Sequence, residues 1–337
     1  MCNIQYREKM HDADPFRAQY LAGLEGLIDR LEQQCRNTRN PQDILDHPEK
    51  YRSRLCQILG WPLTQERPAE IPQARFQLLS EEEELFIYRA EITVLDDITM
   101  CGLLFRHKGE KLRPLVLCQH GGAGSPEIIS GVFGNTYNYN DLTQRVLALG
   151  ANAFAPQLLL WNKKEYGPAD YSRDVIDSKL KDMGSSITAI ELYGMMRILD
   201  YFEAQDWVGK LGMVGLSYGG FYTQFLSAVD TRIQAALSCS FFREHHNATR
   251  PDWCWRDLMR EFGQAELVCL VAPRKLYLQM GNRDDLFDAE TSRAEFARLP
   301  GATADGKTDW AELLVFDGVH ELCKSDEHMR KVIAALK

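Results

Sequence analysis

Hydrophobic residues follow two different spacings along the chain, and the change falls near residue 75. Before residue 60, apolar residues recur three and four positions apart, which is the spacing of amphipathic helices. After residue 75, short apolar runs alternate with amphipathic segments, as strands alternate with helices. We therefore predict an N-terminal helical extension, residues 1–75, followed by a mixed α/β domain, residues 76–337.

Two helices are expected in the extension. Asp14 followed by Pro15 predicts a helix start with Asp14 as the N-cap. The apolar stripe of this first helix comprises Tyr20, Leu21, Leu24, Leu27, Ile28 and Leu31. A second helix is expected to begin near Pro48 and to end at Gly60. The extension either packs on the main domain or acts as a dimerisation arm, so a homo-oligomer is an open alternative.

The α/β domain is expected to begin with antiparallel strands and to continue as a mostly parallel sheet with helices on both faces. Strands are expected near residues 85–88, 92–94, 100–105, 115–118, 151–156, 210–214, 233–239, 275–280 and 313–316. Helices are expected near residues 140–149, 185–204, 221–229 and 289–299 and at the end of the chain. Residues 160–184 and 242–264 are predicted to be irregular loops.

Composition narrows the classes of partner and location. The chain has 337 residues and a formal net charge of −9, which argues against nucleic acid or an anionic membrane as a partner. No apolar run reaches the length of a membrane span, and the polar N-terminus has no apolar segment of the kind found in secretory signals. Nine cysteines without a C-x-x-C pair favour a reducing compartment. We expect a cytoplasmic protein.

Residues 215–219 carry the sequence Gly-Leu-Ser-Tyr-Gly, a G-x-S-x-G motif. The motif follows an apolar strand-like run and precedes an amphipathic helical segment. This order is typical of a nucleophile elbow, in which a sharp turn lifts a serine hydroxyl above the sheet. Small residues must flank the serine in such a turn, and Gly215 and Gly219 supply them. Ser217 is therefore the candidate nucleophile.

Two partners for Ser217 follow strands later in the chain. A serine hydroxyl needs a base to take its proton, and the base is commonly a histidine oriented by a carboxylate. Asp284 and Asp285 come directly after the predicted strand 275–280, and Asp284 is the preferred candidate for the acid. His320 follows the last predicted strand and is the candidate base. The order Ser, Asp, His fits this kind of site.

An oxyanion hole requires two backbone N–H donors near the developing charge. The residue after the nucleophile, Tyr218, is expected to supply one donor. The second is assigned to Gly122, with Gly121 as the alternative, in the glycine-rich loop after an early strand. Candidate substrate-pocket residues are His120, Trp161, His245, Trp253 and Trp255. For His120 a loop-ordering role is the competing interpretation, and for Trp161, Trp253 and Trp255 it is buried packing. For His245 the alternative is a structural role.

With these motifs the chain resembles the α/β-hydrolase superfamily, and within it the bacterial acetyl-xylan-esterase-like and dienelactone-hydrolase-like esterases. Residues 194–235 carry the likeness best, and residues 272–274, Ala-Pro-Arg, are also similar. The resemblance covers about residues 76–337 and implies hydrolysis of carboxylic esters, often of acetylated carbohydrates, through an acyl-enzyme. Dienelactone hydrolases have cysteine where Ser217 stands, and acetyl-xylan esterases usually have Gln or Met where Tyr218 stands.

The sequence thus predicts a serine carboxylesterase of the α/β-hydrolase fold that acts on a small-molecule ester with no cofactor and no metal. Two other functions remain as alternatives. One is a serine peptidase of the prolyl-oligopeptidase type, although the chain is too short for the propeller domain of those enzymes. The other is a non-enzymatic binding protein with a hydrolase fold.

Overall fold

The computed structural model describes residues 4–109, 111–160, 171–244 and 250–337. Nine strands form one sheet in the order β1-β2-β3-β5-β4-β6-β7-β8-β9. Their bounds are Ala74–Glu81, Leu85–Leu95, Ile98–His107, Arg113–Gln119, Asn152–Pro156, Val208–Leu216, Ile233–Cys239, Lys275–Gly281 and Ala311–Phe316 for β1 to β9. Neighbours from β1 to β5 are antiparallel, and neighbours from β5 to β9 are parallel. The predicted antiparallel start and mostly parallel sheet are confirmed.

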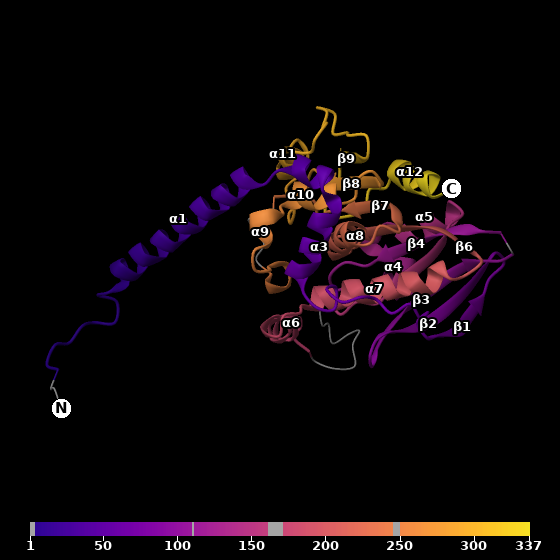
Figure 1. The fold of residues 1–337 in the computed structure, drawn as a ribbon, viewed down its shortest axis with the longest axis horizontal. Coiled ribbons are helices and arrows are strands. Elements are labelled where there is room, and N and C mark those ends of the chain that lie inside the picture. Colours follow the sequence, from indigo (N-terminus) through magenta and orange to yellow (C-terminus); the bar gives the residue numbers. More distant parts are fainter. Residues whose placement is uncertain (1–3, 110, 161–170, 245–249) are drawn as a thin grey trace.

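Helices cover both faces of the sheet (Figure 1). Those that pack on one face are α7 (Ile187–Glu203) and α8 (Tyr218–Val229), and those on the other are α4 (Pro126–Ser130), α5 (Leu142–Ala148) and α12 (Glu327–Leu336). The remaining helices are α1 (Asp14–Thr38), α2 (Pro41–Asp46), α3 (Pro48–Leu59), α6 (Arg173–Asp182), α9 (Leu258–Glu261), α10 (Gln264–Cys269) and α11 (Ala289–Phe296). Short 3-10 turns occur at η1 (Tyr137–Tyr139) and η3 (Pro251–Trp253).

Strand β4 shows why the central strands are apolar without alternation. Leu115 and Leu117 belong to the hydrophobic cluster beneath α7 and α8. Val116 and Cys118 belong to the cluster beneath α5 and α12. Because successive side chains point to opposite faces and both faces are covered, every position of the strand after Arg113 is buried.

The N-terminal extension divides into two parts with different packing. Ile44, Leu55 and Leu59, from α2 and α3, are at most 1% exposed within the main core. Packing on the main domain is therefore right for residues 41–59. It is only partly right for α1, which packs against α9 near its C-terminal end but has no buried residue. Helix α1 also begins one residue earlier than predicted, with Ala13 as the N-cap.

Two segments predicted to be irregular contain helices. Helix α6 lies within residues 160–184, and its buried side chains are the charged Arg173 and Asp177. Hydrophobic spacing could not predict α6, because the side chains that this helix buries are charged. Helix α9 and the start of α10 fall within residues 242–264, where the helical stretches are too short to show a period.

Among the described residues, no helix combines the length and the apolar composition needed to cross a bilayer.

Candidate active site

Ser217 stands at the turn between β6 and α8. Its backbone has φ 60° and ψ −120°, a conformation that is strained for a residue with a side chain. The Ser217 N–H donates to the carbonyl of Cys239, at the end of the neighbouring strand β7, at 2.9 Å. The serine is half-buried, whereas the residues on either side of it are buried. The predicted strand, turn and helix are thus all present around the G-x-S-x-G motif.

Close backbone packing accounts for the two glycines of the motif. A Cβ on Gly215 would lie 2.2 Å from the carbonyl oxygen of Gly219, because the turn folds one against the other. A Cβ on Gly219 would lie 2.1 Å from the carbonyl oxygen of Gln119 at the end of β4. Both contacts are far shorter than a carbon and an oxygen tolerate, so the turn excludes side chains at both positions.

His320 and Asp284 are in direct contact. The Nδ1 atom of His320 lies 2.9 Å from Oδ2 of Asp284, and the Asp284 side chain is fully buried while that of His320 is 21% exposed. Burial acts to raise the pKa of the Asp284 carboxyl, but the hydrogen bond and charge of His320 and the Leu286 N–H hold it below its usual value. The ring of Phe287 stacks on His320 at a centroid distance of 5.6 Å.

The loops after β8 and β9 hold this pair together. The Asn282 N–H donates to Phe316 O and the Arg283 N–H donates to Gly318 O, each at 2.9 Å. These bonds extend the pairing of the two strands into the loops that carry the aspartate and the histidine. Asp285, the other candidate for the acid, is exposed. The structure therefore brings Asp284, and not Asp285, to His320.

Ser217 and His320 lie at the same edge of the sheet. Strands β6, β7, β8 and β9 are adjacent and parallel, so their carboxyl ends meet there. Cys239 connects the two loops, because its carbonyl accepts the Ser217 N–H while its Sγ lies 3.2 Å from Glu321 O, next to His320. Only Nε2 of the His320 ring is left to face a hydroxyl, since Nδ1 is taken by Asp284.

The glycine-rich loop after β4 passes directly beside Ser217. A Cβ on Gly121 would lie 3.2 Å from Cβ of Ser217. The Gly121 N–H already donates to the hydroxyl of Tyr139 at 2.8 Å, which favours Gly122 over Gly121 as the second oxyanion donor. The Tyr218 N–H belongs to the first turn of α8, where helix amides face the N-terminal end and favour negative charge.

His120 orders this loop from within. The imidazole is fully buried, accepts the Leu158 N–H at Nε2 (3.1 Å) and contacts Gly121 O through Nδ1 (2.9 Å). Because Nε2 accepts a hydrogen bond, the ring is neutral with its proton on Nδ1. Burial lowers the pKa of His120 to about 4. Both ring nitrogens contact backbone groups of the loops around them. These contacts favour the loop-ordering role over a position in the wall of the substrate pocket.

The buried His120 leads us to expect a loss of stability in mild acid. Its pKa rises from about 4 in the folded state to about 6.5 on unfolding, so the unfolded chain binds more protons between these values. The free energy of unfolding should then fall by about 2 kcal/mol from pH 7 to pH 5 through this one group. Urea unfolding of wild type and His120→Asn at both pH values measures it. Equal pH dependence in the two proteins would contradict the expectation.

The aromatic pocket candidates are buried where the structure describes them. Trp253 and Trp255 are each 8% exposed and belong to the main hydrophobic cluster. The ring of Trp253 lies 4.9 Å from that of Tyr218, and the ring of Trp255 lies parallel to that of Phe221 at 6.3 Å. Both positions fit the packing alternative. Trp161 and His245 lie outside the described residues.

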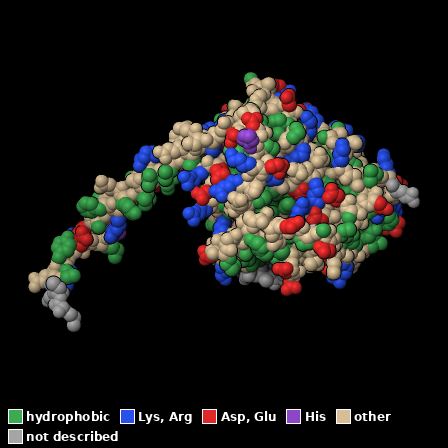
Figure 2. All heavy atoms as spheres, viewed as in Figure 1, with side chains coloured by type: hydrophobic (Ala, Val, Ile, Leu, Met, Phe, Trp, Pro, Cys, Tyr) green, Lys and Arg blue, Asp and Glu red, His purple; other side chains and the backbone are tan. Residues whose placement is uncertain are grey.

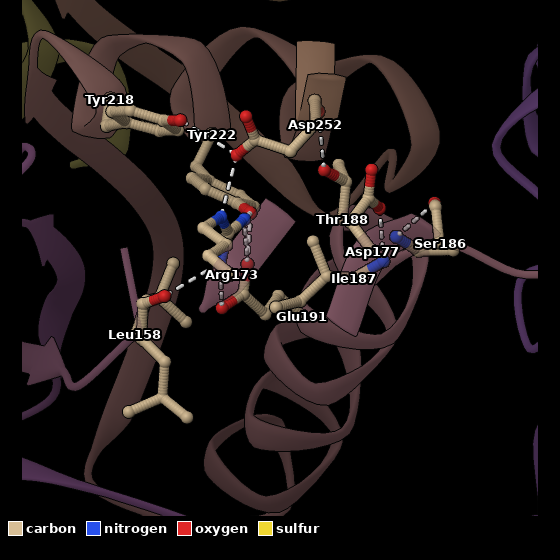
Figure 3. A network of polar contacts seen from close by, with 12 residues as sticks. Leu158, Arg173, Asp177, Ser186, Ile187, Thr188, Glu191, Tyr218, Tyr222 and Asp252 are labelled. Atoms are coloured by element: carbon tan, nitrogen blue, oxygen red, sulfur yellow. Dashed lines mark hydrogen bonds and ion pairs between the residues drawn. The ribbon is translucent and has the colours of Figure 1, made fainter. Parts of the chain in front are cut away.

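A buried polar network lies beside the nucleophile elbow, with Arg173 between Asp252 and Glu191 (Figure 3). Arg173 contacts Asp252 at 2.6 Å and binds both carboxylate oxygens of Glu191, at 2.9 and 2.8 Å. It also donates to the Tyr222 hydroxyl at 2.8 Å. The Tyr218 hydroxyl donates to Asp252 at 2.7 Å, so the network holds the side chain of the residue that follows Ser217. Burial, followed by the charge of Asp252, raises the pKa of Tyr218.

Sequence reasoning missed several residues that shape this site. Tyr139 binds the Gly121 N–H, and Asn138 donates its side-chain amide to His320 O at 3.0 Å. Neither stands in a recognisable motif. Arg173, Glu191 and Asp252 were missed as well, because they come from three separate segments. Among the described residues, no group of three or more His, Cys, Asp or Glu side chains is arranged to hold a metal ion.

Comparisons with known proteins support the architecture. No protein-family model matches the chain. The chain is 26% identical over 260 residues to a Bacillus subtilis (strain 168) protein named "Putative hydrolase YtaP", an alignment that spans 71% of this chain and 82% of that protein.

Solved structures resemble the whole body of the chain. A Bacteroides fragilis NCTC 9343 protein, titled a "putative acetyl xylan esterase", has a TM-score of 0.65 at 17% identity, covering 90% of this chain and 88% of its own. A glucuronoyl esterase from Solibacter usitatus has a TM-score of 0.61 at 16% identity, covering 88% and 91%. Acetyl xylan esterase 1 from Thermoanaerobacterium sp. JW/SL YS485 has a TM-score of 0.59 at 14% identity, covering 90% and 98%.

These similarities, together with the sheet order and the elbow after β6, show that the chain has the α/β-hydrolase fold. The fold predicted from the sequence is confirmed. At sequence identities of 14–17%, similarity to the solved structures establishes the fold alone. The chemistry follows from the residues of the site.

Proposed function

We propose that this protein is a serine esterase that cleaves carboxylic esters of short acyl groups through an acyl-enzyme intermediate. The observation that carries the proposal is the contact of His320 Nδ1 with Asp284 Oδ2 at the sheet edge where Ser217 occupies its strained turn. A serine on an elbow, a histidine and a carboxylate in this order form the arrangement used for acyl transfer.

The first half of the reaction forms the acyl-enzyme. Ser217 Oγ attacks the ester carbonyl while Nε2 of His320 takes the hydroxyl proton. Asp284 keeps the imidazole oriented and stabilises the imidazolium that forms. The N–H groups of Gly122 and Tyr218 bind the oxyanion of the tetrahedral intermediate. When the intermediate collapses, the carbon–oxygen bond to the alcohol breaks, and His320 returns the proton to the leaving alcohol.

The second half releases the acid. Water takes the place of the alcohol, His320 removes a proton from it, and the resulting hydroxide attacks the acyl carbonyl. The second tetrahedral intermediate collapses with cleavage of the bond to Ser217, and the proton returns to Oγ. The products are one carboxylic acid and one alcohol per ester and water consumed. These steps draw on side chains, backbone N–H groups and water.

Similarity to acetyl xylan esterases favours acetyl esters, and acetylated carbohydrates among them, as substrates. A peptidase of the prolyl-oligopeptidase type is the alternative, and turnover of a peptide anilide compared with that of an acetyl ester separates the two functions. The acyl preference and the alcohol group are therefore the quantities to measure first.

Covalent labelling combined with a substrate series tests the proposal. A fluorophosphonate should modify wild type at Ser217, as mapped by peptide mass spectrometry, and should leave Ser217→Ala unlabelled. Turnover of p-nitrophenyl esters from acetate to octanoate should be fastest for acetate and absent in Ser217→Ala. Label at another residue, or ester turnover retained by Ser217→Ala, would overturn the serine mechanism. Faster cleavage of a peptide anilide than of any ester would favour the peptidase.

A further inference from the structure

Helix α1 projects from the body of the molecule (Figure 1). It packs on the body near its C-terminal end, against α9. Arg39, directly after the helix, is 8% exposed and forms an ion pair with the fully buried Glu266 at 3.3 Å. The Arg39 guanidinium also donates to Met259 O at 3.0 Å. These buried contacts hold the C-terminal end of α1 against the body, and they therefore determine the direction in which the rest of the helix projects.

One face of α1 carries a continuous apolar stripe. Its members are Phe16, Tyr20, Leu21, Leu24, Leu27, Ile28 and Leu31. Each of these side chains is between 40% and 72% exposed. Figure 2 shows hydrophobic side chains spread along the projecting arm. A stripe this long is the kind of surface that proteins normally bury.

The helix has little means of stabilising itself. Gly23 and Gly26 lie in its interior, where glycine is among the least favourable residues. The N-cap, Ala13, offers no side-chain hydrogen bond to the first turn. Most helices in proteins owe their stability to the packing of an apolar face. The stripe therefore needs a covering surface from outside the chain's own body.

We propose that α1 is a dimerisation arm whose apolar stripe packs on the same stripe of a second copy of this chain. Tyr20, Leu24, Leu27 and Leu31 are spaced by four, three and four residues, the a/d spacing of paired helices. Gly23 lies beside Tyr20 and Leu24 with no atom within 4 Å of its ideal Cβ position, which lets a second helix approach closely. A self-complementary stripe suits a two-fold dimer.

The area available agrees with a stable dimer. A fully exposed aliphatic side chain offers on the order of 100 Å² to an interface, and an aromatic side chain offers about 200 Å². The five aliphatic and two aromatic side chains of the stripe, at their exposed fractions, therefore give roughly 500 Å² per copy, or about 1,000 Å² for the pair. Flanking residues of a paired helix add to this figure, and a specific interface begins at about 1,000–1,200 Å².

The charges of α1 favour a protein surface over a lipid surface. Its acidic residues are Asp14, Glu25, Asp29 and Glu32, and its basic residues are Arg17, Arg30 and Arg36. With four acidic and three basic side chains, the helix has a charge of −1 (3 − 4 = −1) within a chain of net charge −9. Helices that lie on membranes are typically rich in Lys and Arg on the polar face.

Two double variants of the full chain test the proposal by light scattering after size exclusion. Leu24→Glu/Leu27→Glu places two carboxylates in the stripe, whereas Ala22→Glu/Gln33→Glu places two on the opposite face of the same helix. Wild type and Ala22→Glu/Gln33→Glu should elute at twice the mass of one chain. The stripe variant should elute as a monomer, with a dimer dissociation constant raised about 100-fold or more. Turnover of p-nitrophenyl acetate by the same samples shows, independently of the oligomeric state, whether the proposed esterase activity is intact.

Three results would overturn the proposal. Wild type could be monomeric at high micromolar concentration, or the stripe variant could stay as dimeric as wild type. In the third, wild type is monomeric and floats with phosphatidylcholine vesicles while the stripe variant does not, which would identify a lipid surface as the occupant. Because the stripe lies outside the candidate active site, failure of the dimer would leave the proposed esterase activity unaffected.

Discussion

Replacing Asp284 with asparagine is expected to lower kcat for ester hydrolysis about 10,000-fold, with little change in KM. The side-chain oxygen of Asp284 that contacts His320 Nδ1 at 2.9 Å fixes which nitrogen carries the proton. An amide in this position can donate to Nδ1, which would move the ring proton to Nε2 and leave no base facing Ser217. Steady-state kinetics with p-nitrophenyl acetate measure the effect.

Asp285→Asn is the matched control for this variant. Asp285 is adjacent in sequence and carries the same charge, but it is exposed and Asp284 occupies the contact with His320. Its kcat should stay within about twofold of wild type, as expected for a surface substitution away from the chemistry. A large loss in Asp285→Asn with a small loss in Asp284→Asn would mean that the loop rearranges when substrate binds, and that the assignment of the acid is wrong.

The position of the candidate site could be predicted because its chemistry follows strand ends. Ser217, Asp284 and His320 each come within a few residues of the end of an apolar strand, and parallel strands bring those ends together. The choice between Asp284 and Asp285 depends on structural detail that the order of strands does not determine. Both follow β8, and the backbone pairing of the Asn282 and Arg283 N–H groups with the loop after β9 determines which one faces His320. Sequence spacing does not contain that pairing.

The packing of the N-terminal extension shows a second limit of sequence reasoning. Hydrophobic spacing predicted helices in the extension, and both helices are present as α1 and α3. An amphipathic pattern indicates that a face needs covering, but it does not say what covers it. Leu55 and Leu59 of α3 meet the chain's own core, whereas the stripe of α1 meets solvent. The two helices look alike in sequence and differ in tertiary context.

The network around Arg173 lies beyond sequence reasoning for a related cause. Arg173 is 18 positions from Glu191 and 79 positions from Asp252. Helix α6 turns its charged residues inward, so the usual association of charge with surface fails there. Buried charges persist only when they are paired and hydrogen-bonded, and Arg173 satisfies two carboxylates at once. The network therefore ties α6, α7 and the segment at η3 to the tyrosine beside the nucleophile.

Arg173→Met is accordingly expected to reduce the free energy of unfolding by about 3–5 kcal/mol, because it leaves Glu191 buried without the cation that binds both of its oxygens and leaves Asp252 with only the more distant Arg250, at 3.4 Å. The Arg173 side chain is 3% exposed and that of Asp252 is fully buried, so solvent screens neither charge. Urea unfolding measures the loss of stability. Arg173→Lys should lose less, because it keeps the charge although it lacks the forked geometry of arginine.

Arg256→Met is the matched control, since that side chain is 96% exposed and lies 3.7 Å from Asp257. This control should change the free energy of unfolding by less than about 0.5 kcal/mol. An Arg173→Met protein as stable as the Arg256→Met control would mean that the carboxylates take up protons or water without penalty, and that the network does not stabilise the region around Tyr218.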